Sequence, residues 1–165
     1  MKSAEYWITH LELEPHPEGG YYKEAYKSKC IITKDCLPGF SGDRSIATAI
    51  YYLLSNEDIS LFHSIKTDEI WHFYYGSPLI IHVLHIDGAY EKIKLGTSID
   101  EGEVIQCVVP AQSWFSAEVA HSSSFGLVGC TVSPGFDFRD FTLAHAHELI
   151  KLFPQHEKLI KKFTK

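Results

Sequence analysis

Two residues of this sequence, His63 and Glu69, combine side-chain types and a spacing suited to acid–base chemistry. An imidazole changes its charge near neutral pH, so His63 is a candidate general base. A carboxylate beside the ring could orient it and raise its proton affinity, and Glu69 follows after a short turn. We therefore expect His63 and Glu69 to be the catalytic residues of a buried site.

Both residues lie in segments rich in β-branched and aromatic residues, which are typical of strands. Side chains alternate between the two faces of a strand, so Glu69, Trp71 and Tyr75 are expected on one face and His72 on the other. Trp71 and Tyr75 would then line a concave, mostly apolar pocket beside the polar pair. The alternation makes Trp71 and Tyr75 candidate ligand-binding residues.

The rest of the chain is typical of short strands separated by turn residues, and Asp87-Gly88 between two apolar runs predicts a hairpin. The expected strands cover residues 21–26, 46–54, 61–65, 69–75, 79–86, 90–95, 106–109, 114–119 and 125–132. Apolar residues recur at helical spacing only near the end, where we expect helices over residues 144–153 and 157–163.

We expect these elements to form one all-β domain over residues 1–165, a sandwich or barrel from about residue 8 to 143 followed by a short helical tail to about 163. Residues 8–13 alternate weakly, and residues 14–20 contain prolines and glycines that predict a turn before the first strand. Residues 27–43 are expected to form a long loop.

The formal net charge is −6, and the basic residues are scattered except for a short group at the end of the chain. This charge distribution is not that of a protein that binds nucleic acid. The first residues contain no signal-peptide-like apolar run, and no stretch approaches roughly 18 apolar residues, so we expect no membrane association and a cytoplasmic location. The four cysteines, Cys30, Cys36, Cys107 and Cys130, are expected to be free thiols.

Four sequence blocks occur in order along the chain: Glu14-Pro-His-Pro-Glu-Gly-Gly-Tyr-Tyr22, Asp68-Glu-Ile-Trp-His-Phe73, Val109-Pro-Ala-Gln-Ser-Trp114 and Val132-Ser-Pro-Gly-Phe-Asp-Phe-Arg-Asp140. With these blocks the chain resembles the cupin superfamily, in the branch described as a domain of unknown function and as sugar-epimerase-like. The resemblance implies a double-stranded β-helix, or jelly-roll barrel, that is commonly a homodimer. It also implies a cavity lined by the positions that match His63, Glu69, Trp71, Gln106 and Trp114.

The same resemblance argues against the metal site of many cupins. His63, Glu69 and Gly76 match the first cupin motif, but Ile65 and Phe115 stand where two of the metal-binding histidines belong. Only two of four ligand positions remain, whereas a mononuclear site needs three or four ligands. We expect no cofactor, and a divalent metal would need His72 or Gln106 as replacement ligands. Gln112 also replaces the usual glycine of the second motif, which puts that turn in question.

The turn before the first strand carries three further candidates, His16, Glu18 and Tyr22, which could rim the cavity and bind a ligand. Turn chemistry explains the adjacent glycines equally well without a ligand. In the epimerases that the family resembles, a histidine removes a proton next to a carbonyl and a tyrosine returns one from the other face. Tyr22, Tyr51 and Tyr75 are the candidates for that tyrosine.

The fourth block and the residue after it carry Phe136, Phe138 and Phe141, and the block is expected to leave the last strand and pack these rings against the barrel and the helical tail. Asp140 in this block could cap the segment that follows. A catalytic role for Asp137 or Asp140 is the alternative that this block leaves open.

The sequence thus favours a metal-independent cupin that binds a small polar metabolite, a sugar or sugar nucleotide, and isomerises or epimerises it with His63 as base. A non-catalytic binding or storage-type cupin is the alternative from a different class, because metal ligands are missing and no proton donor is evident. A metal-dependent cupin dioxygenase or isomerase is the third, and it would require ligands that the motifs do not provide.

Overall fold

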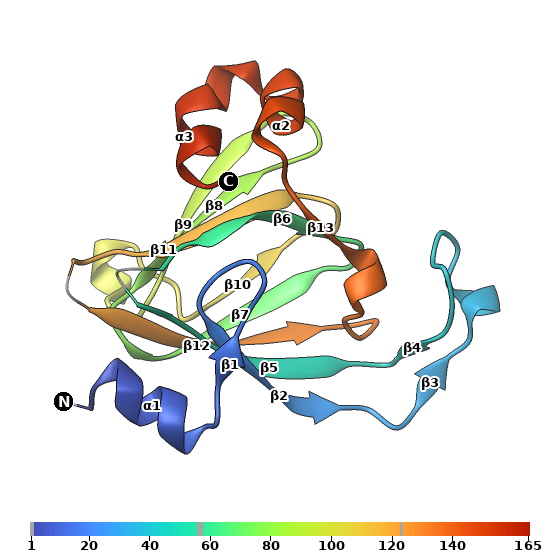
Figure 1. The fold of residues 1–165 in the computed structure, drawn as a ribbon, viewed down its shortest axis with the longest axis horizontal. Helices are drawn as coiled ribbons and strands as arrows, with labels where there is room; N and C mark the ends of the chain where they lie inside the picture. Colours follow the sequence, from blue (N-terminus) through green and yellow to red (C-terminus); the bar gives the residue numbers. More distant parts are fainter. Residues whose placement is uncertain (1, 56–57, 123) are drawn as a thin grey trace.

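A computed structural model describes residues 2–55, 58–122 and 124–165, and its main feature is two antiparallel sheets that lie face to face (Figure 1). The six-stranded sheet contains, in spatial order, β1 (Glu14–Pro15), β2 (Tyr21–Lys27), β5 (Thr48–Ser55), β12 (Phe125–Val132), β7 (Glu69–Gly76) and β10 (Gln106–Val109). The five-stranded sheet contains β13 (Phe141–Leu143), β6 (Ser60–Ile65), β11 (Trp114–Val119), β8 (Leu79–Leu84) and β9 (Tyr90–Leu95). The prediction of an all-β fold is confirmed.

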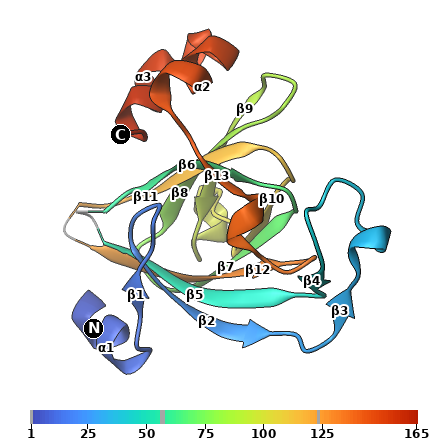
Figure 2. The ribbon, with the colours of Figure 1, turned by 45° about the vertical axis from the view of Figure 1, so that its right-hand side comes forward.

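The remaining elements are short. A two-stranded sheet of β3 (Ile31–Ile32) and β4 (Arg44–Ser45) extends beyond the sandwich (Figure 2). The helices are α1 (Ala4–His10), α2 (Ala146–Leu152) and α3 (Glu157–Lys162), and the 3₁₀ turns are η1 (Lys34–Cys36), η2 (Ile99–Glu101), η3 (Phe138–Asp140) and η4 (Pro154–His156). No helix within the described ranges is both long and apolar enough to cross a membrane.

Alternating apolar residues place the main core between the sheets. Ile81 and Val83 of β8 face Leu54 of β5 and Val128 of β12 in one buried cluster. On each strand, the residues that alternate with these core residues point to the outer face of their sheet, as the two-residue period of a strand requires. This core forms the rigid wall on which the candidate site is built.

The predicted helical tail is confirmed, with α2 and α3 covering the outer face of the five-stranded sheet (Figure 1). Leu149, Ile160 and Phe163 pack there against Phe62 of β6. Phe163 also accepts a backbone hydrogen bond from Phe62 at 2.8 Å, which ties the end of the chain to the sheet. The tail is therefore an integral part of the fold.

The start of the chain differs from the sequence prediction, because α1 replaces the weak alternation of residues 8–13. Ser3 caps the helix by accepting a hydrogen bond from the Tyr6 amide. Trp7, Ile8 and Leu11 recur at helical spacing and pack against the outer face of the six-stranded sheet. That spacing was visible in the sequence and was a better guide than the alternation.

A β-bulge interrupts the pairing of β7 with β12. Leu127 pairs with Tyr75 and Val128 with Phe73, so Tyr74 is the extra residue. Phe73 faces the core between the sheets, while Tyr75 packs beside Trp7 on the outer face. The extra residue thus reverses the face on which Tyr75 lies.

Candidate functional site

A small cavity lies between the two sheets, beneath the segment that links β12 to β13. Water-sized molecules reach a volume of about 40 Å³ within it. Since one water needs roughly 10–15 Å³ by the same measure, the cavity has room for about three. Its polar lining residues are His16, Glu18, Thr48, Tyr52, His63 and Glu69, and its aromatic ones are Tyr22, Trp71, Phe136 and Phe141.

A contact between two buried titratable side chains joins His63 and Glu18 in the cavity wall. The His63 Nε2 atom lies 3.1 Å from the Glu18 Oε2 atom, and the two side chains are 3% and 8% exposed. The other ring nitrogen, Nδ1, lies 2.7 Å from the carbonyl oxygen of Leu61, which only accepts, so Nδ1 carries a hydrogen. Nε2 is therefore the ring nitrogen that faces the Glu18 carboxyl.

The turn between β1 and β2 delivers Glu18 to His63. The Leu61 amide donates a hydrogen bond of 2.8 Å to the Glu18 carbonyl, which docks the turn on β6 (Figure 2). Gly19 has a φ of 114°, and a Cβ there would collide with the carbonyl oxygen of Ile59. The Ser60 hydroxyl then donates to Glu18 Oε1 at 2.9 Å, which fixes the carboxyl in place.

His16 and Tyr52 flank this pair. Burial lowers the pKa of His16, and although Glu18 acts in the opposite direction, the neutral ring is favoured. Its Nδ1 accepts a hydrogen bond of 3.3 Å from the Glu18 amide, which agrees with a neutral ring. Burial also raises the pKa of Tyr52, and its hydroxyl donates to the Gly19 carbonyl at 2.9 Å. Both groups are uncharged neighbours of the His63–Glu18 pair.

Glu69 is a carboxyl group with an altered proton affinity in the same cavity. Burial, with a further contribution from the charge of Glu18, raises the pKa of Glu69 from 4.5 to about 8. The Trp71 indole and the Cys130 thiol lie near enough to oppose this rise. At neutral pH Glu69 is thus a neutral carboxylic acid that can donate a hydrogen bond.

This raised pKa predicts a pH-dependent contribution to stability. Between the unfolded pKa of 4.5 and the folded pKa of about 8, the unfolded state holds fewer protons on Glu69 than the folded state. Stability from this group therefore falls as the pH rises through that window. We expect Glu69→Gln to gain free energy of unfolding relative to wild type between pH 5 and pH 8, measured by denaturant titration. Parallel curves for the two proteins would contradict the raised pKa.

Glu18, not Glu69, is the carboxylate that contacts His63, so the expected orientation of His63 by Glu69 is wrong. Both carboxylates line the cavity, as do the predicted Trp71, His16 and Tyr22. Glu18 was predicted at the rim, yet it is buried next to the imidazole because the turn docks on β6.

Three predicted ligand-binding residues lie outside the cavity. Tyr75 is on the outer face because of the bulge at Tyr74. Gln106 pairs with His72, so it shares the outer face of the sheet, and Cys107 faces inward beside Trp71 instead. Trp114 packs against the helical tail, since its neighbour Phe115 points inward.

The sequence reasoning missed Tyr52, Thr48, Phe136 and Phe141 as cavity residues. It named Tyr51 as a candidate proton donor, but Tyr51 lies on the outer face beside Tyr74. The alternation of Ile50, Tyr52 and Leu54 in β5 was the signal that could have selected Tyr52.

The expected metal-ligand positions are occupied by apolar side chains. Ile65 and Phe115 are buried in the core, and the centroid of the Phe115 ring lies 4.0 Å from the centroid of the His63 ring. Within the described ranges, no three His, Cys, Asp or Glu side chains are arranged to hold a metal ion. Gln112 adopts a φ of 64°, so the turn that normally uses glycine keeps its left-handed conformation.

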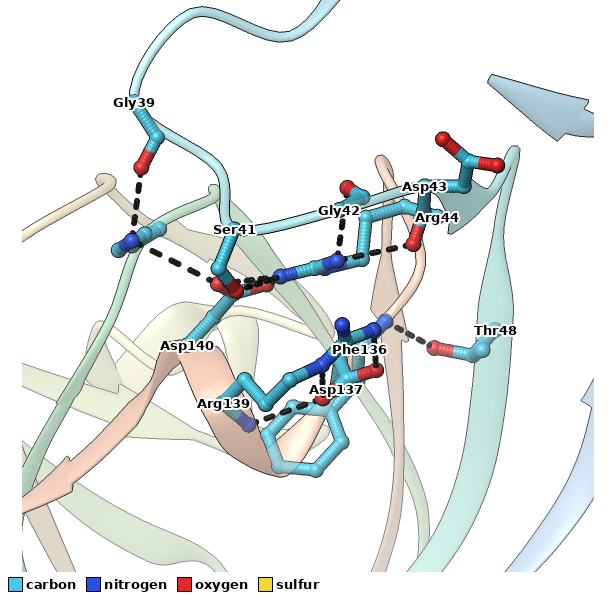
Figure 3. A network of polar contacts seen from close by, with 11 residues as sticks. Gly39, Ser41, Gly42, Asp43, Arg44, Thr48, Phe136, Asp137, Arg139 and Asp140 are labelled. Atoms are coloured by element: carbon cyan, nitrogen blue, oxygen red, sulfur yellow. Dashed lines mark hydrogen bonds and ion pairs between the residues drawn. The ribbon is translucent and has the colours of Figure 1, made fainter. Parts of the chain in front are cut away.

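The segment that links β12 to β13 forms the roof of the cavity. A polar network ties this roof to the loop before β4 (Figure 3). Arg44 donates from Nε and Nη2 to Asp140 at 2.6 and 2.9 Å, and from Nη1 to the carbonyls of Gly42 and Asp43 at 2.8 Å each. These contacts occupy the guanidinium, so Arg44 is a structural residue and not a ligand-binding one. The Phe136 amide donates to Thr48 at 2.9 Å, which fixes the roof to β5.

This network corrects two expectations. Asp140 does not cap the following segment but pairs with buried Arg44, and Asp137 is the residue that caps η3. Phe136 and Phe141 pack in the core between the sheets, and Phe138 is 51% exposed. None of the three rings contributes to the cluster beneath the helical tail.

Comparison with known proteins identifies the family. A family model described as "Cupin superfamily (DUF985)" matches residues 5–144. The chain belongs to the cupin superfamily. This cupin is 30% identical to an uncharacterized protein of Saccharomyces cerevisiae, over 94% of this chain and 82% of the yeast protein.

Solved structures agree with that assignment. A hypothetical protein from Leishmania major is 36% identical with a TM-score of 0.92 and covers 99% of both chains. A protein from Shewanella oneidensis is 35% identical with a TM-score of 0.90, over 100% of this cupin and 99% of that chain. An oxalate decarboxylase variant from Bacillus subtilis, at 14% identity and a TM-score of 0.55 over 90% of this chain and 36% of its own, shares the fold alone. The predicted jelly-roll fold is confirmed.

Proposed function

We propose that this cupin binds a small polar metabolite of the sugar type and transfers a proton on it, with His63 and Glu18 acting together as the base. The observation that carries the proposal is the buried contact of 3.1 Å between His63 Nε2 and Glu18 Oε2 in the cavity wall. A buried imidazole in contact with a carboxylate in a cavity wall is an arrangement typical of functional sites.

The geometry suits proton transfer next to a carbonyl group. The Leu61 carbonyl fixes the His63 ring, and the Ser60 hydroxyl fixes Glu18, so neither side chain has to reorganise. His63 Nδ1 is held by the Leu61 carbonyl, so the proton is taken up at the Nε2–Oε2 contact with Glu18, which a substrate carbon reaches from the cavity side.

The cavity size favours a small ligand. A volume of about 40 Å³ accommodates a few heavy atoms at most. A sugar nucleotide would leave its base and phosphates outside the cavity, whereas a short hydroxy-aldehyde or hydroxy-ketone places its reacting carbons beside the pair. We therefore favour short carbonyl metabolites as substrates, with any attached phosphate lying outside the cavity.

Ligand binding is tested by a thermal-shift screen of the purified protein against short aldoses, ketoses, their phosphates and nucleotide sugars. A ligand that binds only the folded state raises the melting temperature by mass action. We expect a shift with small carbonyl compounds that is lost in His63→Ala and kept in His85→Ala, since His85 lies on the β8–β9 hairpin away from the cavity. Equal shifts in both variants would place the ligand elsewhere.

A further inference from the structure

Trp71 has a buried donor with no acceptor. Its side chain is among the largest that are fully buried, and its Nε1 atom makes no hydrogen bond to any described residue. An unpaired buried N–H costs free energy comparable to a lost hydrogen bond, so native structures rarely leave one without a purpose. The indole lines the cavity, where a ligand could supply the missing acceptor.

Glu69 lies next to this indole on the same face of β7. Side chains two residues apart on a strand point the same way, and both residues line the cavity. The indole is close to the Glu69 carboxyl but does not form a hydrogen bond of normal geometry with it. Glu69 and Trp71 therefore line the cavity together from β7, while His63 and Glu18 come from β6 and the β1–β2 turn.

We propose that the Glu69 carboxyl and the Trp71 indole N–H form an oxyanion-binding pair, which donates hydrogen bonds to the carbonyl oxygen of a ligand whose neighbouring carbon faces His63 and Glu18. This inference rests on the proposed function and specifies its substrate as a carbonyl compound. The raised pKa of Glu69 supports it, because only the protonated carboxyl can donate.

The C–H bond next to the carbonyl breaks, and its proton joins the His63–Glu18 pair. The electron pair forms a carbon–carbon double bond, and the carbonyl π electrons move onto the oxygen as an enolate, which Glu69 and Trp71 stabilise. Return of that proton to the same carbon, or its replacement by a proton from solvent, re-forms the carbonyl compound and frees the pair, which is the exchange that deuterium labelling detects.

The test uses glycolate as a probe of oxyanion binding and ethylene glycol as its control without a carbonyl oxygen. We expect glycolate, but not ethylene glycol, to move the indole N–H resonance of Trp71 downfield in spectra of ¹⁵N-labelled protein. Trp71→Phe should weaken glycolate binding about tenfold by calorimetry, the scale of one lost hydrogen bond to a charged group. Trp7→Phe is the matched control, because Trp7 Nε1 is also buried and unpartnered among the described residues but lies outside the cavity.

A pH titration provides a second measurement if Trp71→Phe fails to fold. Glycolate binding by wild type should weaken as the pH rises through about 8, where Glu69 loses its proton, and Glu69→Gln should remove that loss because an amide still donates. The other titratable groups that line the cavity or lie beside Glu69 are His16, Glu18, Tyr22, Tyr52, His63, Cys107 and Cys130. They are identical in the two proteins, so the difference between the curves isolates Glu69.

Several results would overturn the inference: an unmoved Trp71 resonance, equal weakening by Trp71→Phe and Trp7→Phe, or superimposable pH curves for wild type and Glu69→Gln. The proposed function fails separately. If wild type shows no deuterium exchange that depends on His63, while glycolate binding depends on Trp71 and Glu69 as expected, proton transfer is contradicted but the oxyanion-binding pair is not. Exchange that depends on His63 while glycolate ignores Glu69 and Trp71 would contradict only the oxyanion-binding pair.

Discussion

His63→Gln is expected to lower the rate of proton exchange on the substrate by roughly 10²–10⁴-fold, the usual contribution of a positioned general base. Glutamine can still accept a hydrogen bond, but it cannot take up a proton. Glu18→Gln should cause a loss of similar size, because the Glu18 carboxylate contacts His63 Nε2 at 3.1 Å and stabilises the imidazolium that forms when the ring takes up a proton. The double variant should be little worse than either single one, since residues that act as a unit are not additive.

His82→Gln is the matched control for this prediction. His82 is also a buried histidine beside a glutamate, with its Nε2 atom 3.4 Å from Glu118 Oε1, and burial lowers its pKa. It stacks near Tyr90 and Phe163 beneath the helical tail, away from the cavity. Equal losses of activity in His63→Gln and His82→Gln would indicate a general structural effect and contradict the role of His63.

Asp140→Ala is expected to lower the free energy of unfolding by about 3 kcal/mol, since it leaves the guanidinium of Arg44 buried without its partner. Arg44 and Asp140 have side chains that are 1% and 6% exposed and form two charge-assisted hydrogen bonds. Lys66 lies 3.7 Å from Asp140 and cannot replace it, because it is also a cation. Denaturant unfolding followed by tryptophan fluorescence measures this loss.

Asp137→Ala provides the comparison within the same segment. Asp137 pairs with Arg139, whose side chain is 53% exposed, so water screens the ion pair. Arg139 holds the pKa of Asp137 well below its usual range, yet removal of such an exposed pair should cost much less than removal of Asp140. Similar losses in the two variants would mean that the Arg44–Asp140 contact is not the brace of the cavity roof.

Periodicity was sufficient for the sheets because it reflects local steric rules. Alternating apolar residues predicted the main strands and placed Trp71 correctly on the inner face. The same rule failed at Tyr75, because one extra residue at Tyr74 reverses the alternation and nothing local marks the bulge. For Trp114 the sequence held a usable contradiction, since Phe115 matched an inward-facing position and its neighbour must then face outward.

The composition of the site depended on contacts between distant segments. Glu18 meets His63 because the β1–β2 turn docks on β6 through the Leu61 amide, a contact that no spacing rule contains. The buried pairing of Arg44 with Asp140 likewise joins segments 96 positions apart. The high proton affinity of Glu69 arises from burial, and the extent of burial depends on the folded structure and cannot be read from the sequence.

The most direct test of proton transfer is deuterium exchange in D₂O, followed by NMR, on a panel of short aldoses, ketoses and their phosphates with wild type and His63→Gln in parallel. We expect wild type to place deuterium on the carbon next to the carbonyl of at least one compound, faster than buffer alone, and His63→Gln not to do so. Exchange by wild type at the rate of buffer, or at the rate of His63→Gln, would contradict a catalytic His63–Glu18 pair and leave this cupin as a binding protein.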